Sequence, residues 1–497
     1  MPSFSEWQQQ AQNITISTQA IINGKACDAL SGNTFDCISP IDGRVLGQIA
    51  ACGAEDVELA VNAARNAFES GCWAELKPVD RKSILLRFAA LIDQYSDELA
   101  LLETLDMGKP ISDSLSIDVP EARDSIAWNA EAIDKINGEI APTGDNELGL
   151  VTREPLGVIG AIVPWNFPMA MACWKLGPAL ATGNSVILKP SEKSPLSAIR
   201  LAELALEAGI PAGVFNVLPG YGVEVGDPLA RHMDVDGLVF TGSTAVGKQL
   251  LSVAGSTNMK RTFVECGGKS PNIVFADAPD LRAAAEAAAM AIFFNQGEVC
   301  VAGSRLLVED SIAEKFIPMV CEASKNIRPG HPLDPATIMG AIVDDVQMRK
   351  VLGFIDKGQQ EGAELVCGGK HVEPVAGGYY LEPTIFKAVS PQMSIAKNEI
   401  FGPVLSCMTF NSEEQAIRMA NDSDFGLAAG LWTSNLSRAH RVSRKLRAGS
   451  IWVNCYDVGD MTAPFGGFKQ SGNGRDKSLH ALEKYTEIKA TWINLDT

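Results

Sequence analysis

The segment 237-GLVFTGSTAVGKQLL-251 carries the pattern that decides the fold. An apolar run from Leu238 to Phe240 stops at a turn of small residues, and a helical pattern starts directly after that turn. A strand, a short turn and a helix in direct succession form the unit from which parallel sheets are built. N–H groups at the start of such a helix bind anions, so Gly242 and Ser243 are candidate phosphate contacts. Because the segment lacks the GxGxxG spacing, a plain strand–helix turn is an equal alternative.

Similar units repeat on both sides of this segment. We predict two doubly wound α/β domains, split near residue 264, because strand and helix patterns alternate before and after that point. In the first series, helices are predicted at 55–70, 80–106, 116–136 and 197–209, and strands starting at 157, 185, 214, 237 and 261. In the second series, helices are predicted at 281–297, 311–325 and 413–422, and strands at 304–310, 404–410 and 451–454.

Further strand patterns lie outside both series, at 140–155 and 486–495. A strand without a neighbour in its own domain exposes unpaired backbone groups and tends to pair with another strand. We therefore predict that these segments form a small β-strand extension that pairs with another chain.

The composition argues against several classes of partner. The chain has 497 residues with 46% hydrophobic and 21% charged residues, which is typical of globular domains, and a net charge of −18. An acidic surface disfavours nucleic acid and anionic membranes as partners. The 11 cysteines form no CxxC and the 5 histidines form no HxH or HxxxH, so we expect no metal site and reduced thiols in a cytoplasmic protein. No signal sequence or membrane helix is predicted.

Three segments carry residues suited to nucleophilic chemistry. In 295-NQGEVCVAGSR-305, Gly297 allows a tight turn before Cys300 in an apolar setting, although most such thiols only fill space. In 164-PWNFP-168, Asn166 between prolines and aromatics is a candidate donor to an oxyanion, or an amide that ties down a turn. In 264-VECGGKS-270, Glu265 at a strand end is a candidate general base or an ordinary surface glutamate.

Two more segments carry candidate contacts to a nucleotide. Lys189 and Glu192 in 189-KPSE-192 follow a strand, where a carboxylate accepts from a ribose 2′-hydroxyl and repels a 2′-phosphate. In 399-EIFGPV-404, Glu399 is suited to hold a sugar diol and Phe401 to pack on a flat ligand. A solvated turn and an ordinary strand entrance are the respective alternatives.

In their order and spacing these motifs resemble the NAD(P)-dependent aldehyde dehydrogenase superfamily, and the resemblance runs from about residue 20 to the C-terminus. It implies that Cys300 is the nucleophile, that Asn166 stabilises the oxyanion, and that Glu265 activates water to hydrolyse a thioester. A Glu at position 265 separates this chain from the acylating branch. Cys266 stands where the family usually has Leu, and we expect it to affect packing only.

The same resemblance implies a cofactor cleft that takes NAD, with NADP possible and less favoured. The implied cofactor contacts are Trp165, Lys189, Glu192, Gly242, Ser243, Glu399 and Phe401. It also implies an NAD-binding domain at 1–138 and 156–264 with 465–485 packing back on it, a catalytic domain at 265–464, and an oligomerisation extension at 139–155 and 486–497. A homo-oligomer, either a dimer or a dimer of dimers, is the expected assembly.

Acidic residues mark the predicted substrate entrance. Glu121, Asp124 and Trp128 share one face of the helix 116–136, with Asp118 one turn earlier. In the family this helix and the loop 455–467, here with Asp457 and Asp460, border the substrate tunnel. Carboxylates and an indole suit a cation, so we expect a cationic or amide-bearing ω-aminoaldehyde.

Segments 329–340 and 458–487 resemble bacterial γ-glutamyl-γ-aminobutyraldehyde and 4-guanidinobutyraldehyde dehydrogenases of polyamine and arginine degradation. The alternatives left open are a broad-specificity aliphatic aldehyde dehydrogenase, a thiol esterase without redox chemistry, and a silent NAD-binding structural relative.

Overall fold

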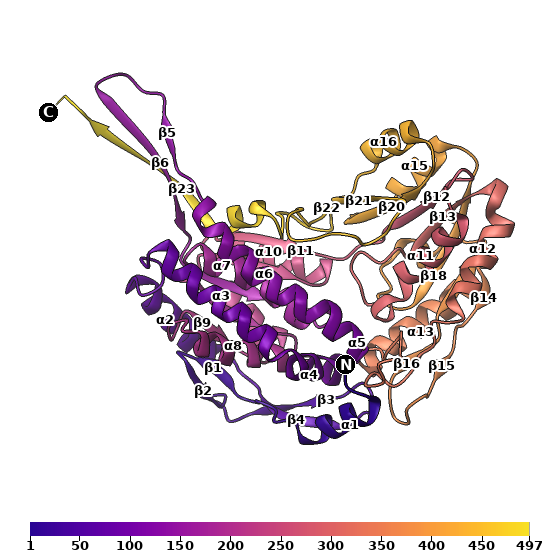
Figure 1. Cartoon of the computed structure of the whole chain (residues 1–497), viewed down its shortest axis with the longest axis horizontal. Coiled ribbons are helices and arrows are strands. Elements are labelled where there is room, and N and C mark those ends of the chain that lie inside the picture. Colours follow the sequence, from indigo (N-terminus) through magenta and orange to yellow (C-terminus); the bar gives the residue numbers. More distant parts are fainter. Residues whose placement is uncertain (497) are drawn as a thin grey trace.

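Two parallel sheets flanked by helices make up most of the molecule (Figure 1). The computed structural model describes residues 1–496. All strands of the first sheet lie before residue 266, and all strands of the second lie after residue 270. The predicted α/β fold class, with doubly wound domains and a β-strand extension, is confirmed. The domain boundaries predicted from the sequence remain a prediction.

The first sheet has the strand order β11-β10-β7-β8-β9-β1-β2. Its parallel strands are β7 (Val158–Ile162), β8 (Ser185–Lys189), β9 (Phe215–Val217), β10 (Gly237–Thr241) and β11 (Arg261–Glu265). Residues of β7, β8 and β10 are buried throughout, which explains their continuous apolar runs. The antiparallel edge strands β1 (Ala20–Ile22) and β2 (Lys25–Cys27) are too short to give a sequence signal.

The helices of the first half differ from the predicted ones mainly at their ends. They are α2 (Ala54–Glu69), α3 (Pro78–Gln94), α4 (Ser96–Met107), α6 (Val119–Ala132), α7 (Pro168–Ala181), α8 (Leu196–Ala208) and α10 (Thr244–Ser256), with shorter α1 (Phe4–Asn13), α5 (Ile111–Asp113) and α9 (Asp227–Arg231). The predicted helix 80–106 is broken at Tyr95 into α3 and α4. The predicted helix 116–136 starts as a π-helical turn at Ser114–Asp118.

The second sheet has the order β14-β17-β18-β13-β12-β20-β21 and is parallel except between β14 and β17. Its strands are β12 (Pro271–Val274), β13 (Arg305–Glu309), β14 (Glu364–Cys367), β17 (Thr384–Lys387), β18 (Val404–Phe410), β20 (Ala428–Trp432) and β21 (Ser450–Val453). Its helices are α11 (Leu281–Phe293), α12 (Asp310–Ser324), α13 (Asp345–Gln360), α14 (Ser394–Lys397), α15 (Glu413–Asn421) and α16 (Leu436–Lys445).

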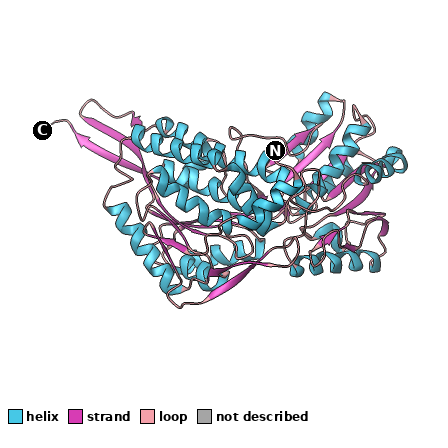
Figure 2. Ribbon diagram, turned by 60° about the horizontal axis from the view of Figure 1, so that its bottom comes forward, coloured by secondary structure: helices cyan, strands magenta, loops and turns pink. Residues whose placement is uncertain are grey.

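A third sheet projects from the body of the molecule, as Figures 1 and 2 both show. It has the order β23-β6-β5, with β5 (Glu139–Ala141), β6 (Glu147–Pro155) and β23 (Thr486–Asn494). β23 and β6 run antiparallel from the pair Thr486 and Pro155 to the pair Asn494 and Glu147. The segments predicted at 140–155 and 486–495 thus pair with each other.

Short strand pairs complete the fold: β3 (Thr34–Ile38) with β4 (Val45–Ala50), β15 (His371–Val372) with β16 (Tyr380–Leu381), and β19 (Phe425–Gly426) with β22 (Phe468–Lys469). The chain after β22 returns to the first sheet, where Asn473 N–H donates to Val264 O at 2.9 Å. No helix within residues 1–496 combines the length and the apolar character needed to cross a bilayer.

Candidate active site

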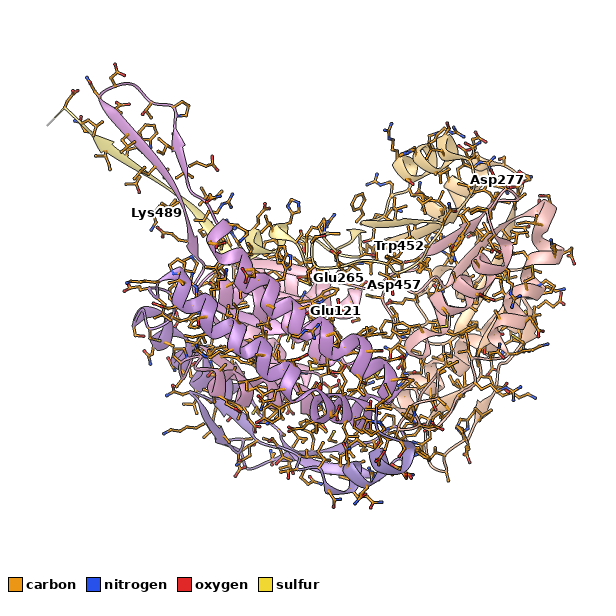
Figure 3. The ribbon with its side chains drawn as sticks, viewed as in Figure 1. Glu121, Glu265, Asp277, Trp452, Asp457 and Lys489 are labelled. Carbon is orange, nitrogen blue, oxygen red and sulfur yellow. The ribbon has the colours of Figure 1, made fainter. Side chains whose placement is uncertain are left out.

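Residues from both parallel sheets line one large cavity, with a volume of about 1190 Å³. Cys300, Glu265 and Asn166, which the sequence predicts to be catalytic, all line it. Glu265 ends β11, Asn166 follows β7, and Cys300 follows α11. In Figure 3, Glu265 lies where the two halves of the molecule meet. Ligands of open α/β sheets bind at the carboxyl ends of the strands, and the arrangement agrees with this rule.

The loop that delivers Cys300 has a left-handed backbone. Asn295, Gln296 and Gly297 have φ angles of 45°, 57° and 73°. Such angles cost about 1–3 kcal/mol at a residue other than glycine, so contacts must hold the loop. One such contact is the amide of Asn295, which donates to the carbonyl oxygen of Asn166 at 3.2 Å. A Cβ on Gly297 would lie 2.4 Å from a backbone atom of a neighbouring segment, so this turn requires glycine.

The surroundings of Cys300 favour the protonated form of its thiol. Burial raises its pKa well above the ordinary value, and the carboxylates of Glu265, Glu399 and Asp457 raise it further. The backbone N–H of Val301 acts in the opposite direction. Since only a thiolate is a strong nucleophile, a base in the cavity must take this proton before Cys300 reacts.

Asn166 is held rigidly beside the nucleophile. It is 4% exposed, and its Nδ2 donates to the carbonyl oxygen of Glu298 at 2.8 Å. An amide nitrogen carries two N–H groups, so the second can donate to an oxygen atom in the cavity. The bond to Glu298 ties this donor to the same loop that carries Cys300, which preorganises both groups.

Glu265 is a buried carboxyl group with an altered acidity. It is 5% exposed, and neither of its carboxyl oxygens has a hydrogen-bond partner among residues 1–496. Burial raises its pKa to about 8, although the nearby ammonium groups of Lys175 and Lys484 oppose this change. A carboxyl group with this pKa exchanges protons close to neutral pH, as a general base must.

A buried ion triad next to Glu265 was not predicted from the sequence. Asp476 pairs with Lys175 at 2.5 Å and also with Lys484. Although burial opposes ionisation, the two ammonium groups lower the pKa of Asp476. The only hint of this triad in the sequence was Lys175, a single lysine in the otherwise apolar segment 168–181.

The start of helix α10 fits a phosphate group. Gly242 and Ser243 line the cavity, and the hydroxyl of Ser243 caps the helix by accepting from the N–H of Val246 at 3.4 Å. The first N–H groups of a helix and its dipole attract anions. A plain strand–helix turn would not need to face a cavity, so this position supports the predicted pyrophosphate contact.

A second part of the cleft suits the sugar and the ring of a nucleotide. Glu399 lines the cavity and accepts from the N–H of Gly268 at 3.0 Å, and burial raises its pKa to about 7. A Cβ on Gly267 would lie 2.0 Å from a Glu399 oxygen, so only glycine permits this approach. Phe401, with φ of 60°, packs edge-on against Trp165 with ring centres 5.2 Å apart. These residues fit the dinucleotide that the sequence implies.

Lys189 and Glu192 lie together but not on the cavity wall. Their side chains form an ion pair at 3.1 Å at the end of β8. Lys189 is buried and Glu192 is about one-third exposed at 33%. The pair lies at the same sheet edge as Asn166, because Val163 N–H donates to Lys189 O. Their role as ribose contacts remains a prediction.

The predicted acidic entrance is partly formed. Glu121, Asp124, Asp457 and Asp460 all line the cavity, and Figure 3 places Glu121 and Asp457 close together. Asp457 lines the cavity and is exposed to solvent. The surrounding protein raises the pKa of Asp457 to about 6, first by desolvation and then by repulsion from Glu121, while Lys477 lowers it.

Two of the side chains expected at this entrance, Asp118 and Trp128, lie elsewhere. Asp118 is fully buried and pairs with Lys109 at 2.5 Å, because the π-helical turn before α6 directs it into the core. Trp128 lies outside the cavity lining, since seven residues of helix carry it about 10 Å beyond Glu121. Asp124 lines the cavity but is paired with Arg123 at 2.7 Å.

Other side chains at this entrance were missed because they come from distant segments. Trp174 and Trp452 supply the indole rings that were expected from Trp128. Lys477 forms an ion pair with Glu121 at 2.6 Å. Nothing in the local sequence around 116–136 or 455–467 points to these partners.

Comparison with known proteins adds independent evidence. The model of a family described as the aldehyde dehydrogenase family matches residues 28–491. The NADP/NAD-dependent aldehyde dehydrogenase PuuC of Escherichia coli (strain K12) is 55% identical over 490 residues, which cover 99% of this chain and 98% of PuuC.

Solved structures are similar over the whole length. A crystal structure of an indole-3-acetaldehyde dehydrogenase complexed with NAD⁺ has 63% identity and a TM-score of 0.99, covering 100% of both chains. A γ-glutamyl-γ-aminobutyraldehyde dehydrogenase from Burkholderia cenocepacia J2315 has 59% identity and a TM-score of 0.98, covering 99% of this chain and 100% of that one.

Proposed function

The chain belongs to the aldehyde dehydrogenase family, and from this premise we propose that it oxidises an ω-aminoaldehyde to the carboxylic acid, with Cys300 as the nucleophile. The family consists of NAD(P)-dependent oxidoreductases, and a similar structure contains NAD⁺. The single observation that carries the proposal is that Cys300, Asn166 and Glu265 line one cavity with the start of helix α10.

The first step is the addition of Cys300 to the aldehyde. Glu265, in its ionised form, is the base in the cavity that can take the proton of the thiol. The thiolate attacks the carbonyl carbon, and the carbonyl oxygen becomes the oxyanion of a thiohemiacetal. The second N–H of the Asn166 amide and the backbone N–H of Cys300 donate to this oxyanion.

NAD, when bound, would supply the hydride acceptor, and loss of the hydride from the reacting carbon would leave a thioester on Cys300. The start of α10 at Ser243 would hold the pyrophosphate, and Glu399 would hold the ribose next to the nicotinamide. Glu265 must first release the thiol proton to solvent. It then takes a proton from the water that attacks the thioester, and the acid leaves as the thiolate of Cys300 is restored. The Glu192 carboxylate supports NAD over NADP, because it would repel a 2′-phosphate.

The acidic entrance supports an amine-bearing aldehyde. Glu121, Asp457 and Asp460 line the cavity on the side of the mouth loop, residues 455–467, and carboxylates attract an ammonium or guanidinium group. The similar enzyme from Burkholderia acts, by its description, on γ-glutamyl-γ-aminobutyraldehyde. Both observations support a substrate from the catabolism of polyamines or arginine.

A neutral aromatic aldehyde is a second candidate substrate. Trp174, Trp452, Tyr456 and Phe465 also line the cavity, and aromatic side chains favour a flat apolar group. The description of another similar structure names indole-3-acetaldehyde.

A kcat/KM panel tests the substrate assignment. We expect NADH formation with 4-guanidinobutyraldehyde and γ-glutamyl-γ-aminobutyraldehyde at least about tenfold more efficient than with hexanal or succinic semialdehyde, which is the scale of one charged contact. Indole-3-acetaldehyde and NADP complete the panel.

The control is Cys300→Ala, which should bind NAD normally by calorimetry and form no NADH with any aldehyde. Equal efficiency with hexanal and the amine-bearing aldehydes would refute the aminoaldehyde proposal. Ester hydrolysis by the wild-type protein without any NADH formation would instead support a thiol esterase.

We also propose that the β-strand extension forms a homo-oligomer, a dimer or a dimer of dimers. The extension exposes apolar side chains that a monomer would leave in water: Ile140, Ile488, Trp492, Ile493 and Leu495. The predicted division into an NAD-binding domain, a catalytic domain and this extension is part of the same proposal.

A further inference from the structure

Lys477 lies at the acidic entrance although its segment is remote in sequence from the rest of that entrance. Its ammonium group is 2.6 Å from Glu121, and the two side chains are only 14% and 25% exposed. Both residues line the cavity, together with Asp457. An ion pair at this depth is less screened by solvent than a pair on the open surface.

The same ammonium group lies over an aromatic ring. It is 4.5 Å from the ring centre of Trp174, which also lines the cavity. Proteins often bind the cation of a substrate between a carboxylate and the face of an indole ring. Here the ammonium group of Lys477 already occupies such a position, between Glu121 and Trp174.

Three carboxylates of the entrance, those of Glu121, Asp457 and Asp460, lie near this one ammonium group. Asp457 interacts electrostatically with both Glu121 and Lys477: the carboxylate of the first raises the pKa of Asp457, and the ammonium group of the second lowers it. A substrate that ends in a lone cation would be attracted by the carboxylates and repelled by Lys477. A substrate end with an ammonium and a carboxylate on neighbouring atoms would find a partner for each charge.

The backbone holds this arrangement in place. Lys477, Ser478 and Asp457 have φ angles of 57°, 51° and 55°, which non-glycine residues adopt only when contacts hold them. The N–H of Ser478 donates to the carbonyl oxygen of Met461 at 2.8 Å, which ties the Lys477 segment to the mouth loop. Strained residues of this kind cluster at ligand-binding positions.

We propose that Lys477 is a specificity-determining residue, and that its ion pair with Glu121 beside Asp457 selects aldehydes whose far end is a zwitterion of the α-amino acid type over aldehydes that end in a single cation. The inference rests on the proposed function and refines its substrate class. Lys477 binds the carboxylate of the substrate, and the acidic side chains bind its ammonium group.

The experiment compares Lys477→Met with Lys477→Arg. Three aldehydes serve as probes: γ-glutamyl-γ-aminobutyraldehyde as the zwitterion, 4-guanidinobutyraldehyde as the cation, and hexanal as the neutral reference. Methionine keeps the packing on Trp174 and removes the charge, whereas arginine keeps the charge. Lys325→Met, at the exposed end of α12 and outside the cavity and the extension, controls for the change in net charge.

For Lys477→Met we expect the kcat/KM ratio of zwitterion to cation to fall by about tenfold or more, the scale of a lost charged hydrogen bond. The change should appear in KM, because the group is remote from the reacting carbon. Lys477→Arg and Lys325→Met should keep the ratio within about twofold of the wild-type value.

Two outcomes would overturn the inference. One is an unchanged ratio in Lys477→Met, and the other is an equal loss with all three aldehydes, which would indicate a merely structural role. Failure of the proposed function looks different, because the wild-type protein would then oxidise none of the three probes.

Discussion

Glu265 shows at the scale of one residue how position changes chemistry. Its carboxyl group is buried, lacks a hydrogen-bond partner among residues 1–496, and lies near the ion triad of Lys175, Asp476 and Lys484. Burial favours the neutral acid, and the excess of ammonium over carboxylate in the triad favours the carboxylate. The balance leaves a pKa of about 8, so the residue can both take and release a proton.

This acidity predicts the pH dependence of turnover. Because burial raises the pKa of Glu265 to about 8, the ionised base is scarce below that pH and dominant above it. Hydrolysis of the thioester should therefore speed up as pH rises through about 8 and then level off. In Glu265→Gln the rise should disappear. Stopped-flow absorbance should show at most one NADH per site, formed more slowly than in the wild type because the thiol also loses its base, with still slower turnover after it.

The matched control is Glu399→Gln, since Glu399 faces the same cavity but is proposed to hold ribose. This control should weaken cofactor binding and keep the pH-dependent hydrolysis of a preformed thioester. Normal steady-state turnover by Glu265→Gln would contradict the assignment of the base.

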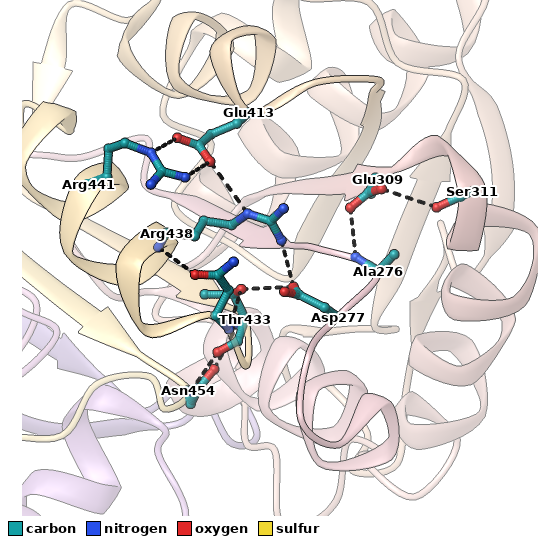
Figure 4. A network of polar contacts seen from close by, with 10 residues as sticks. Ala276, Asp277, Glu309, Ser311, Glu413, Thr433, Arg438, Arg441 and Asn454 are labelled. Carbon is teal, nitrogen blue, oxygen red and sulfur yellow. Dashed lines mark hydrogen bonds and ion pairs between the residues drawn. The ribbon is translucent and has the colours of Figure 1, made fainter.

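At the scale of elements, a polar network holds the origin of the mouth loop (Figure 4). Asn454 follows β21 and exchanges two hydrogen bonds with the backbone of Thr433, which follows β20. The hydroxyl of Thr433 donates to Asp277 at 2.8 Å, and Arg438 of α16 also donates to Asp277. Arg438 lies over the ring of Phe275, which anchors the network on the core.

We predict that Asn454→Asp displaces the mouth loop. An aspartate has no N–H₂ group, so its oxygen would face the carbonyl oxygen of Thr433. The part-buried hydrogen bond at this position would be lost, at a cost of about 0.5–1.5 kcal/mol. KM for the aldehyde should rise at least about threefold, while the Kd for NAD stays unchanged.

Steady-state kinetics and calorimetry measure the two constants. Asn435→Asp is the matched control, because Asn435 caps α16 through its oxygen and an aspartate can do the same. Equal KM values for wild type and Asn454→Asp would contradict a positioning role of the network.

At the scale of the whole molecule, the cavity depends on elements that are far apart. The first sheet supplies Glu265, the second half supplies Cys300, and the segment after β22 supplies Lys477. The extension starts directly after this last segment, at Thr486. An oligomer that forms through the extension would therefore restrain the adjoining segment of the chain, which carries Lys477.

We predict that Trp492→Lys reduces the size of the assembly. Trp492 is 64% exposed on β23, and burying such a ring between chains contributes several kcal/mol to association. Light scattering after size-exclusion chromatography should show a smaller mass for the variant. Leu436→Lys replaces a similarly exposed apolar residue on α16 and should leave the mass unchanged. The same mass for both variants would count against an interface at the extension.

The sequence predicted those parts of the fold that have a strong local signal. The strands β7, β8, β10 and β18 and helices such as α8 were found because buried parallel strands and amphipathic helices repeat a simple pattern. Helix α7 was missed because it follows the PWNFP segment and is apolar on all sides, so it has no helical periodicity. The strands β1 and β2 were missed because three residues carry too little pattern.

By itself, the sequence determined the α/β class, the family and the identity of Cys300, Asn166 and Glu265 as candidates, since each lies in a motif that can be read within a few residues. Only the tertiary structure decided what surrounds them. In the structure Lys477 pairs with Glu121, and the ion triad lies beside Glu265. Asp118 is buried in the core, and the indole rings at the entrance belong to Trp174 and Trp452 and not to Trp128. The physical reason is that charge pairing and burial depend on distance in space, and these partners are separated by up to hundreds of residues along the chain.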